Sequence, residues 1–160
     1  MQELKITERR YPRHILRVSQ IQRRARDSVE GLEKVVPGTM EQVEDKVRVA
    51  LKAAGFGVLT EIDMSATLRE KIGVERAPMK VLGACNPNLI HQALEMSNSV
   101  ALFVPCNVVL QMVDGGIKVS ALDPMTIMAA PEMEELGLQA RGLLVGAIAS
   151  LDGVNEATTA

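Results

Sequence analysis

The chain has 160 residues, 47% of them hydrophobic, with a net charge of −2, no Trp, one Tyr and two Phe. This content is enough for one core of ordinary size, filled with aliphatic side chains and nine Met rather than aromatic rings. No stretch approaches the ~20 consecutive apolar residues of a membrane span, and the amino terminus has no apolar signal-peptide core. We therefore expect a cytoplasmic protein without a membrane span, in which Cys85 and Cys106 are free thiols.

The first 38 residues differ in composition from the rest. They hold nine Lys or Arg against five Asp or Glu, a net charge of +4, whereas residues 39–160 hold nine against fifteen, a net charge of −6. Apolar residues recur in this first segment at helical spacings. They are Ile15, Val18, Ala25, Val29, Leu32 and Val36. We expect an Arg-rich helical extension over residues 1–38, a single α+β domain over 39–151 and a frayed tail over 152–160.

A second helix is expected after Pro37 and Gly38, which end the first. Thr39 and Gln42, three positions apart, form the pattern of a capping box. The face of this helix that points to the core is predicted from spacing. It consists of Met40, Val43, Val47, Ala50 and Ala54. Gly55 then stands where a left-handed residue commonly ends a helix.

The next elements alternate between strand and helix. Residues 56–62 are rich in branched side chains and predict a strand, followed by a short helix over about 66–72 and a second strand over 79–82. Asn86 is a favoured helix cap and Pro87 a favoured first helical residue, so a helix is expected from there, with Leu89, Ala93 and Leu94 facing the core.

The second half of the chain predicts a hairpin and a final helix. Pro105 splits an apolar stretch into residues 100–104 and 107–113, and it should lie at a strand edge or bulge. A glycine turn leads to a further strand over 117–122. A helix is expected over about 132–151. The fold class is therefore α+β, with a mixed, partly antiparallel sheet and helices packed on it.

Several segments together resemble one known family. They are Gly55–Val58 with Glu61–Asp63, Leu82–Pro87, Val104–Val109 and Asp123–Met125. In order and spacing they are similar to the signatures of domain-of-unknown-function family 302, over about residues 40–150. The resemblance implies a compact α+β domain that associates as a homodimer or higher homo-oligomer. It implies no established reaction, so it assigns the chain to no class of enzyme.

The leading candidate site joins two corners of the chain, at residues 83–87 and 105–107. A thiolate beside a helix start is stabilised by free amides, which would lower the pKa of Cys85. The bulge at Pro105 would aim Cys106 toward a cleft. We expect a shallow site for a small ligand. Its residues are Cys85, Asn86, Pro87, Cys106 and Asn107.

Two thiols also suggest a soft metal ion or a redox or sulfur-handling pair. His91 would be a third ligand, from the helix that follows Cys85, although a structural zinc site usually has four protein ligands. The cofactor is left unidentified. The alternative is that Cys85 and Cys106 are small buried core residues of a non-catalytic structural or oligomerisation module.

Two other binding hypotheses are weaker. The amides of Asn86, Asn88 and Leu89 would hold an anion at a helix start, unless Asn86 and Pro87 merely begin that helix. The arginines of the extension would neutralise phosphates, but the rest of the chain is acidic and the pI is about 5.7. We therefore expect no nucleic-acid partner. Asp63 and Asp123 stand beside turns, where capping explains them.

Overall fold

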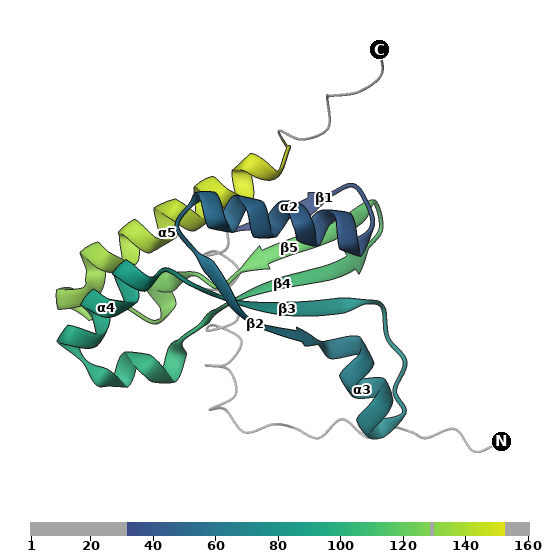
Figure 1. Ribbon diagram of the computed structural model, residues 1–160, viewed down its shortest axis with the longest axis horizontal. Coiled ribbons are helices and arrows are strands. Elements are labelled where there is room, and N and C mark those ends of the chain that lie inside the picture. The colour runs from purple at the N-terminus through teal and green to yellow at the C-terminus, as the bar shows by residue number, and fades with distance from the viewer. Residues whose placement is uncertain (1–31, 129, 153–160) are drawn as a thin grey trace, which may run out of the picture.

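The computed structural model describes residues 32–128 and 130–152, which form an α+β domain around one sheet (Figure 1). The described strands make a five-stranded sheet in the order β1-β5-β4-β3-β2. Their bounds are β1 (Glu33–Val36), β2 (Gly57–Asp63), β3 (Met79–Cys85), β4 (Cys106–Val113) and β5 (Gly116–Ala121).

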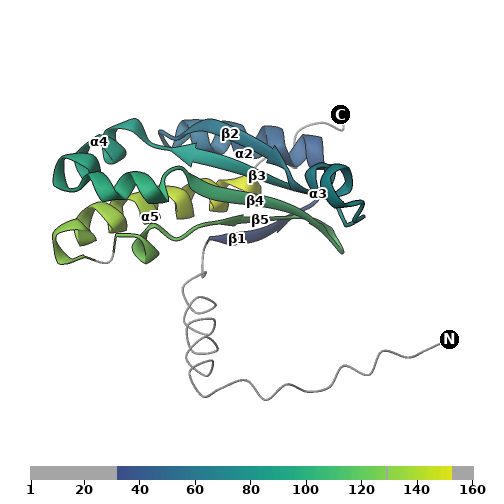
Figure 2. The same cartoon turned by 90° about the horizontal axis from the view of Figure 1, so that it is seen from below.

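Two long helices cover one face of this sheet, and in Figure 2 the strands lie in front of them. The α-helices are α2 (Met40–Ala53), α3 (Met64–Ile72), α4 (Pro87–Met96) and α5 (Glu134–Ala149). The short 3-10 helices are η2 (Asn98–Phe103), η3 (Pro124–Thr126), η4 (Pro131–Met133) and η5 (Ser150–Asp152). Helices α2 and α5 pack against each other on the sheet. None of the helices within the described ranges is long and apolar enough to cross a membrane.

Local capping signals in the sequence are confirmed. The Thr39 side chain accepts from the Gln42 amide at 3.3 Å, and the Gln42 side chain accepts from the Thr39 amide at 3.0 Å. Gly55, just past the end of α2, has a φ of 84°. Asn86 caps α4 and Pro87 is its first residue. These signals act within three or four residues, so they do not depend on the rest of the fold.

The predicted mixed sheet is wrong, because all four strand pairings are antiparallel. The alternation of strand and helix between residues 56 and 82 suggested a crossover. Instead, α3 sits beyond the end of β2 and β3, with no buried residue of its own, and the chain returns antiparallel beside β2. A crossover helix must cover a face of the sheet. The exposed α3 only lengthens the connection.

Two other expected elements are also different. Val36, expected in the first helix, is buried in β1, where it pairs with Ile117 of β5. The hydrogen bonds along β5 explain this, because a helix there would leave the edge of β5 unpaired. Residues 100–104, expected as a strand, lie mostly in η2. The rest of the predicted extension, residues 1–31, and the tail after 152 lie outside the described residues.

The core has two clusters. The larger lies between the sheet and the helices α2 and α5, and includes Val47, Leu82 and Val108. The smaller lies between α4, η2, the η3–η4 segment and the first half of α5, and includes Leu89, Met128 and Leu136. Leu143 of α5 packs against both clusters. The seam between them runs past the end of β3 and the start of β4.

Candidate thiol pocket

The two cysteines meet where β3 ends and β4 begins. Cys85 is the last residue of β3 and Cys106 the first of β4. The strand register pairs Ala84 with Cys106, so Cys85 is one residue beyond that pair. Pro105 precedes the strand directly, and because it has no amide hydrogen it fits only at such an edge.

Both cysteines line one mostly apolar pocket, here called the thiol pocket. The space inside it that can hold the centre of a water-sized sphere is about 40 Å³, and all its empty space, open solvent included, is about 360 Å³. Its lining consists of Phe56, Ala84, Cys85, Asn86, Leu89, Ile90, Val104, Cys106, Pro124, Met128 and Ala140. Phe56 and Ala84 belong to the larger core cluster, and Leu89, Met128 and Ala140 to the smaller one. The thiol pocket therefore lies on the seam between the two clusters.

The thiols in this pocket are protonated at neutral pH. Burial raises the pKa of Cys85 above the usual 9.0. Burial also raises the pKa of Cys106, and the neighbouring Cys85 raises it further. The sequence had suggested a lowered pKa at the helix start, and that expectation is wrong. Both cysteines are free. Neutral thiols contact a ligand through polarisable sulfur but are weak nucleophiles.

The other residues expected at the site are divided between two places. Asn86 lines the thiol pocket, and its side-chain oxygen accepts from the amides of Asn88 and Leu89 at 3.1 and 3.3 Å. Those amides are thus already bonded, which supports capping over anion binding at this helix start. Pro87 is exposed on α4, and Asn107 lines a separate groove outside the sheet.

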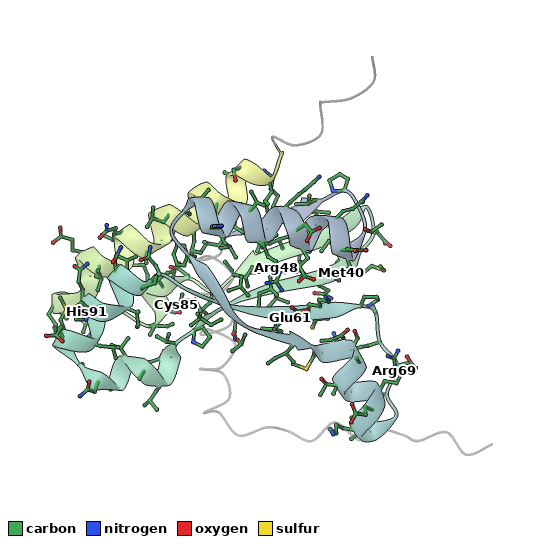
Figure 3. The ribbon with its side chains drawn as sticks, viewed as in Figure 1. Met40, Arg48, Glu61, Arg69, Cys85 and His91 are labelled. Carbon is green, nitrogen blue, oxygen red and sulfur yellow. The ribbon has the colours of Figure 1, made fainter. Side chains whose placement is uncertain are left out.

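A metal site with His91 does not assemble in the described part of the chain. His91 is exposed on α4, and Figure 3 shows it well away from Cys85. Within residues 32–128 and 130–152, no group of three or more His, Cys, Asp or Glu side chains is placed to hold a metal ion. The soft donors in the lining of the thiol pocket are the thiols of Cys85 and Cys106 and the thioether of Met128.

Sequence reasoning missed the wall of the pocket that comes from the second half of the chain. Met128 and Ala140 lie far from both cysteines in sequence, on either side of η4. Ordinary apolar residues at these positions carry no local signal of a site. Ala140 reaches the thiol pocket through the packing of α5 against α4, and Met128 reaches it from the segment between η3 and η4.

Sequence reasoning also missed a ring of four charges between α2 and the sheet. Glu44 of α2 accepts from Lys80 of β3 at 2.7 Å and from Arg48 at 2.7 Å. Glu61 of β2 accepts from Lys80 at 2.9 Å and also from Arg48. Each acid thus bonds both bases, and Figure 3 shows Arg48 and Glu61 facing each other. We call these four residues the charge ring.

The charge ring is electrostatically satisfied. Burial alone would raise the pKa of Glu44, but the hydrogen bonds from Lys80 and Arg48 outweigh burial, and the pKa is lowered. The pKa values of Lys80 and Arg48 are both raised, in each case first by the hydrogen bond to Glu44. Glu44, Lys80 and Arg48 are therefore held in their charged forms, and none of these three is a candidate acid or base at neutral pH. The charge ring joins α2 to the sheet.

The two aspartates beside turns are caps, as the sequence predicted. Asp63 accepts from the Ala66 amide at 2.8 Å at the start of α3. Asp123 accepts from the Met125 amide at 2.9 Å, and its second oxygen accepts from Arg141 of α5 at 3.2 Å. The buried Asp123 thereby holds the η3 segment, which includes the pocket residue Pro124, against α5.

Comparison with known proteins places this architecture in a family context. The family model described as domain of unknown function DUF302 matches residues 32–151. A crystal structure of an uncharacterised conserved DUF302 protein from Bacillus stearothermophilus is similar, with a TM-score of 0.68 and 26% sequence identity. That similarity covers 73% of this chain and 94% of the other. No curated protein matches the chain.

Proposed function

This chain belongs to the DUF302 family, and on that premise we propose that it binds a small, uncharged and mostly apolar ligand in the thiol pocket. The observation that carries the proposal is the position of this pocket on the seam between the two core clusters. A gap between two separately packed clusters is a common place for a ligand, because it is concave and apolar. The two thiols and Asn86 are its polar features.

The size and charge of the pocket limit the ligand. A space of about 40 Å³ for the centres of water-sized spheres holds the equivalent of about three waters, so the rest of a larger ligand would extend into the open mouth. No ionised residue lines the pocket, and both thiols have raised pKa values. An anion or cation would therefore lose its hydration without gaining a partner.

A soft metal ion is a narrower version of the same proposal. Cys85 and Cys106 would supply two sulfur ligands, and both would have to lose their protons. The raised pKa values oppose that loss, so a neutral ligand fits the pocket better.

We also propose, from the family resemblance and the expected free thiols, a cytoplasmic homo-oligomer. Light scattering tests the oligomer.

The burial of Cys85 favours a second function. Only 9% of this residue is exposed, as expected of a core cysteine. In this alternative the thiol pocket is a packing defect, and the domain is a non-catalytic structural or oligomerisation module.

The test is native mass spectrometry of the full chain purified without added metal, combined with elemental analysis. The pocket variants are Cys85→Ala, Cys106→Ala and Ala140→Val, the last of which adds volume to the pocket wall. The matched control is Leu138→Ala, on α5 but exposed. A bound mass that is lost in all three pocket variants and kept in the control supports ligand binding, and metal in the elemental analysis would identify the soft-ion version.

The alternative predicts a different result. No bound mass would be found, both thiols would react with Ellman's reagent only after unfolding, and Ala140→Val would leave the chain at least as stable as wild type. That combination contradicts a ligand site and supports a structural role for the cysteines.

A further inference from the structure

An open apolar groove lies where β4 begins and β5 ends, separate from the thiol pocket. It measures about 540 Å³, and its lining includes Leu102, Phe103, Pro105, Asn107, Leu122 and Ile127. Leu102 is 82% exposed and Phe103 52%. Large apolar side chains gathered around a groove usually mark a surface that something covers.

The described chain begins beside this groove. The carbonyl of Leu32 accepts from the Ala121 amide at 2.9 Å, which continues the pairing of β1 with β5 by one residue. The next residue, Leu122, lines the groove, and its amide donates to the carbonyl of Asn107, also at 2.9 Å. Leu32, the first described residue, therefore pairs with the residue directly before a residue of the groove wall.

The sequence of that segment suits the groove. Val18, Ile21, Ala25 and Val29 follow one another at spacings of three and four, which would place them on one side of a helix. Val29 is three residues from Leu32, so it reaches at most about 10 Å from it. The arginines of residues 1–31 mostly occupy other positions of this repeat and would stay in solvent.

We propose that the chain's own amino-terminal segment docks in this groove, with Val29 and Ala25 against the exposed leucines and Phe103. A tethered segment has an effective concentration in the millimolar range, so it competes well with a separate partner. A second copy would need to bury about 800 Å² on each partner, whereas the large exposed apolar side chains of the groove are Leu102, Phe103 and Leu122. This inference concerns the groove and does not depend on a ligand in the thiol pocket.

The test uses tryptophan fluorescence, because the chain has no natural Trp. Leu102→Trp places a single probe in the groove of the full chain, at a position too exposed to carry packing. Val29→Glu, added to this background, puts a charge on the apolar side of the segment. Gln20→Glu is the matched control, because it adds the same charge on the opposite side of the predicted helix.

The expected result is that Val29→Glu raises acrylamide quenching of the probe at least about twofold, as a docked population becomes an undocked one. Gln20→Glu should leave quenching unchanged. A second probe, Val49→Trp on the exposed side of α2, should not respond to either substitution.

Two results would overturn the proposal. Equal quenching of the groove probe in the Val29→Glu and Gln20→Glu backgrounds would show that the segment does not cover it. Shielding that disappears on dilution, together with a fall in mass by light scattering, would show that a second copy occupies the groove instead.

Discussion

The reactivity of the thiol pocket is decided by two side chains with raised pKa values. An acid whose pKa is raised by folding stabilises the folded state fully below the unfolded pKa, and this stability is lost as pH rises toward the folded pKa. For Cys85 and Cys106 the window begins at about 9.0, the ordinary value. The unfolded thiols ionise there while the folded ones stay protonated.

Unfolding stability should therefore decline above pH 9.0 in the wild-type chain, at a slope of at most about 1.4 kcal/mol per pH unit for each thiol. Urea unfolding between pH 7 and 10.5 measures this slope. In the Cys85→Ala/Cys106→Ala variant the slope should be smaller, whatever its stability at pH 7. An equal slope in both chains would mean that the thiols titrate normally.

Gly83 shows how tightly the outer face of the sheet is packed beside Cys106. A Cβ at this position would clash with the Thr60 hydroxyl and lie 2.5 Å from Pro105 Cγ. Gly83→Ala should therefore destabilise the chain by about 1–3 kcal/mol, because Pro105 and its strand would have to shift. Denaturant unfolding measures the loss.

The control for this change is Gly142→Ala. Gly142 lies in α5 with nothing within 4 Å of an added Cβ, so alanine should stabilise the helix by about 0.5–1 kcal/mol. If Gly83→Ala were as harmless as Gly142→Ala, the sheet would have to be more open at Pro105 than the structure describes.

At the scale of elements, the charge ring holds α2 on β2 and β3. Glu44→Ala should cost about 1–3 kcal/mol, because Lys80 and Arg48 then share Glu61 alone. Asp45→Ala, the exposed neighbour on α2, should change stability by less than about 0.5 kcal/mol. Thermal or urea unfolding at pH 7 gives both values.

The pH dependence of this effect has a definite sign. The pKa of Glu44 is lowered from 4.5, so its contribution is present above pH 4.5 and is lost as pH falls through the lowered pKa. The difference between wild type and Glu44→Ala should shrink below pH 4.5. A constant difference down to pH 2 would assign the cost to lost packing and not to charge.

Elements with local signals were predictable from sequence, and those set by distant pairing were not. The caps at Thr39 and Asn86 act through neighbouring residues, so α2 and α4 begin where expected. Val36 has a strand conformation only because β5, some eighty residues later, offers an edge. The same contrast applies to the thiol pocket. Cys85 and Cys106 were expected there because nearby residues mark the corners where they stand, whereas Ala140 reaches the pocket only through helix packing.

At the scale of the whole molecule, the two clusters share one helix, α5. Leu144 and Ile148 belong to the larger cluster, while Leu136 and Ala140 belong to the smaller. The sequence predicted a helix here but not this division, although the first half of α5 carries Glu134, Glu135 and Arg141 and the second half is apolar throughout. Composition does not say which cluster each half meets. A ligand in the thiol pocket would contact both clusters and link them.

Local stability should follow the distribution of buried residues. Helix α3 has none, and β2, next to it, is largely exposed. The central strands β4 and β5 supply Val108, Leu110 and Val119, which are fully buried. Elements with few buried contacts open at low free energy, whereas core strands exchange near the global free energy of unfolding. Hydrogen exchange should therefore be faster in β2 than in β4 and β5.

Hydrogen exchange with mass spectrometry tests this at neutral pH. Peptides that cover residues 64–72 should exchange first, and those that cover 108–121 last, with slower exchange at the thiol pocket if a ligand is bound. Because the charge ring joins α2 to β2 and β3, its loss should act on these elements first. Glu44→Ala should therefore speed exchange in β2 and the adjacent half of α2 without affecting β5. Equal acceleration in every peptide would mean that the domain opens as one unit and that β2 and α2 are not less stable than the central strands.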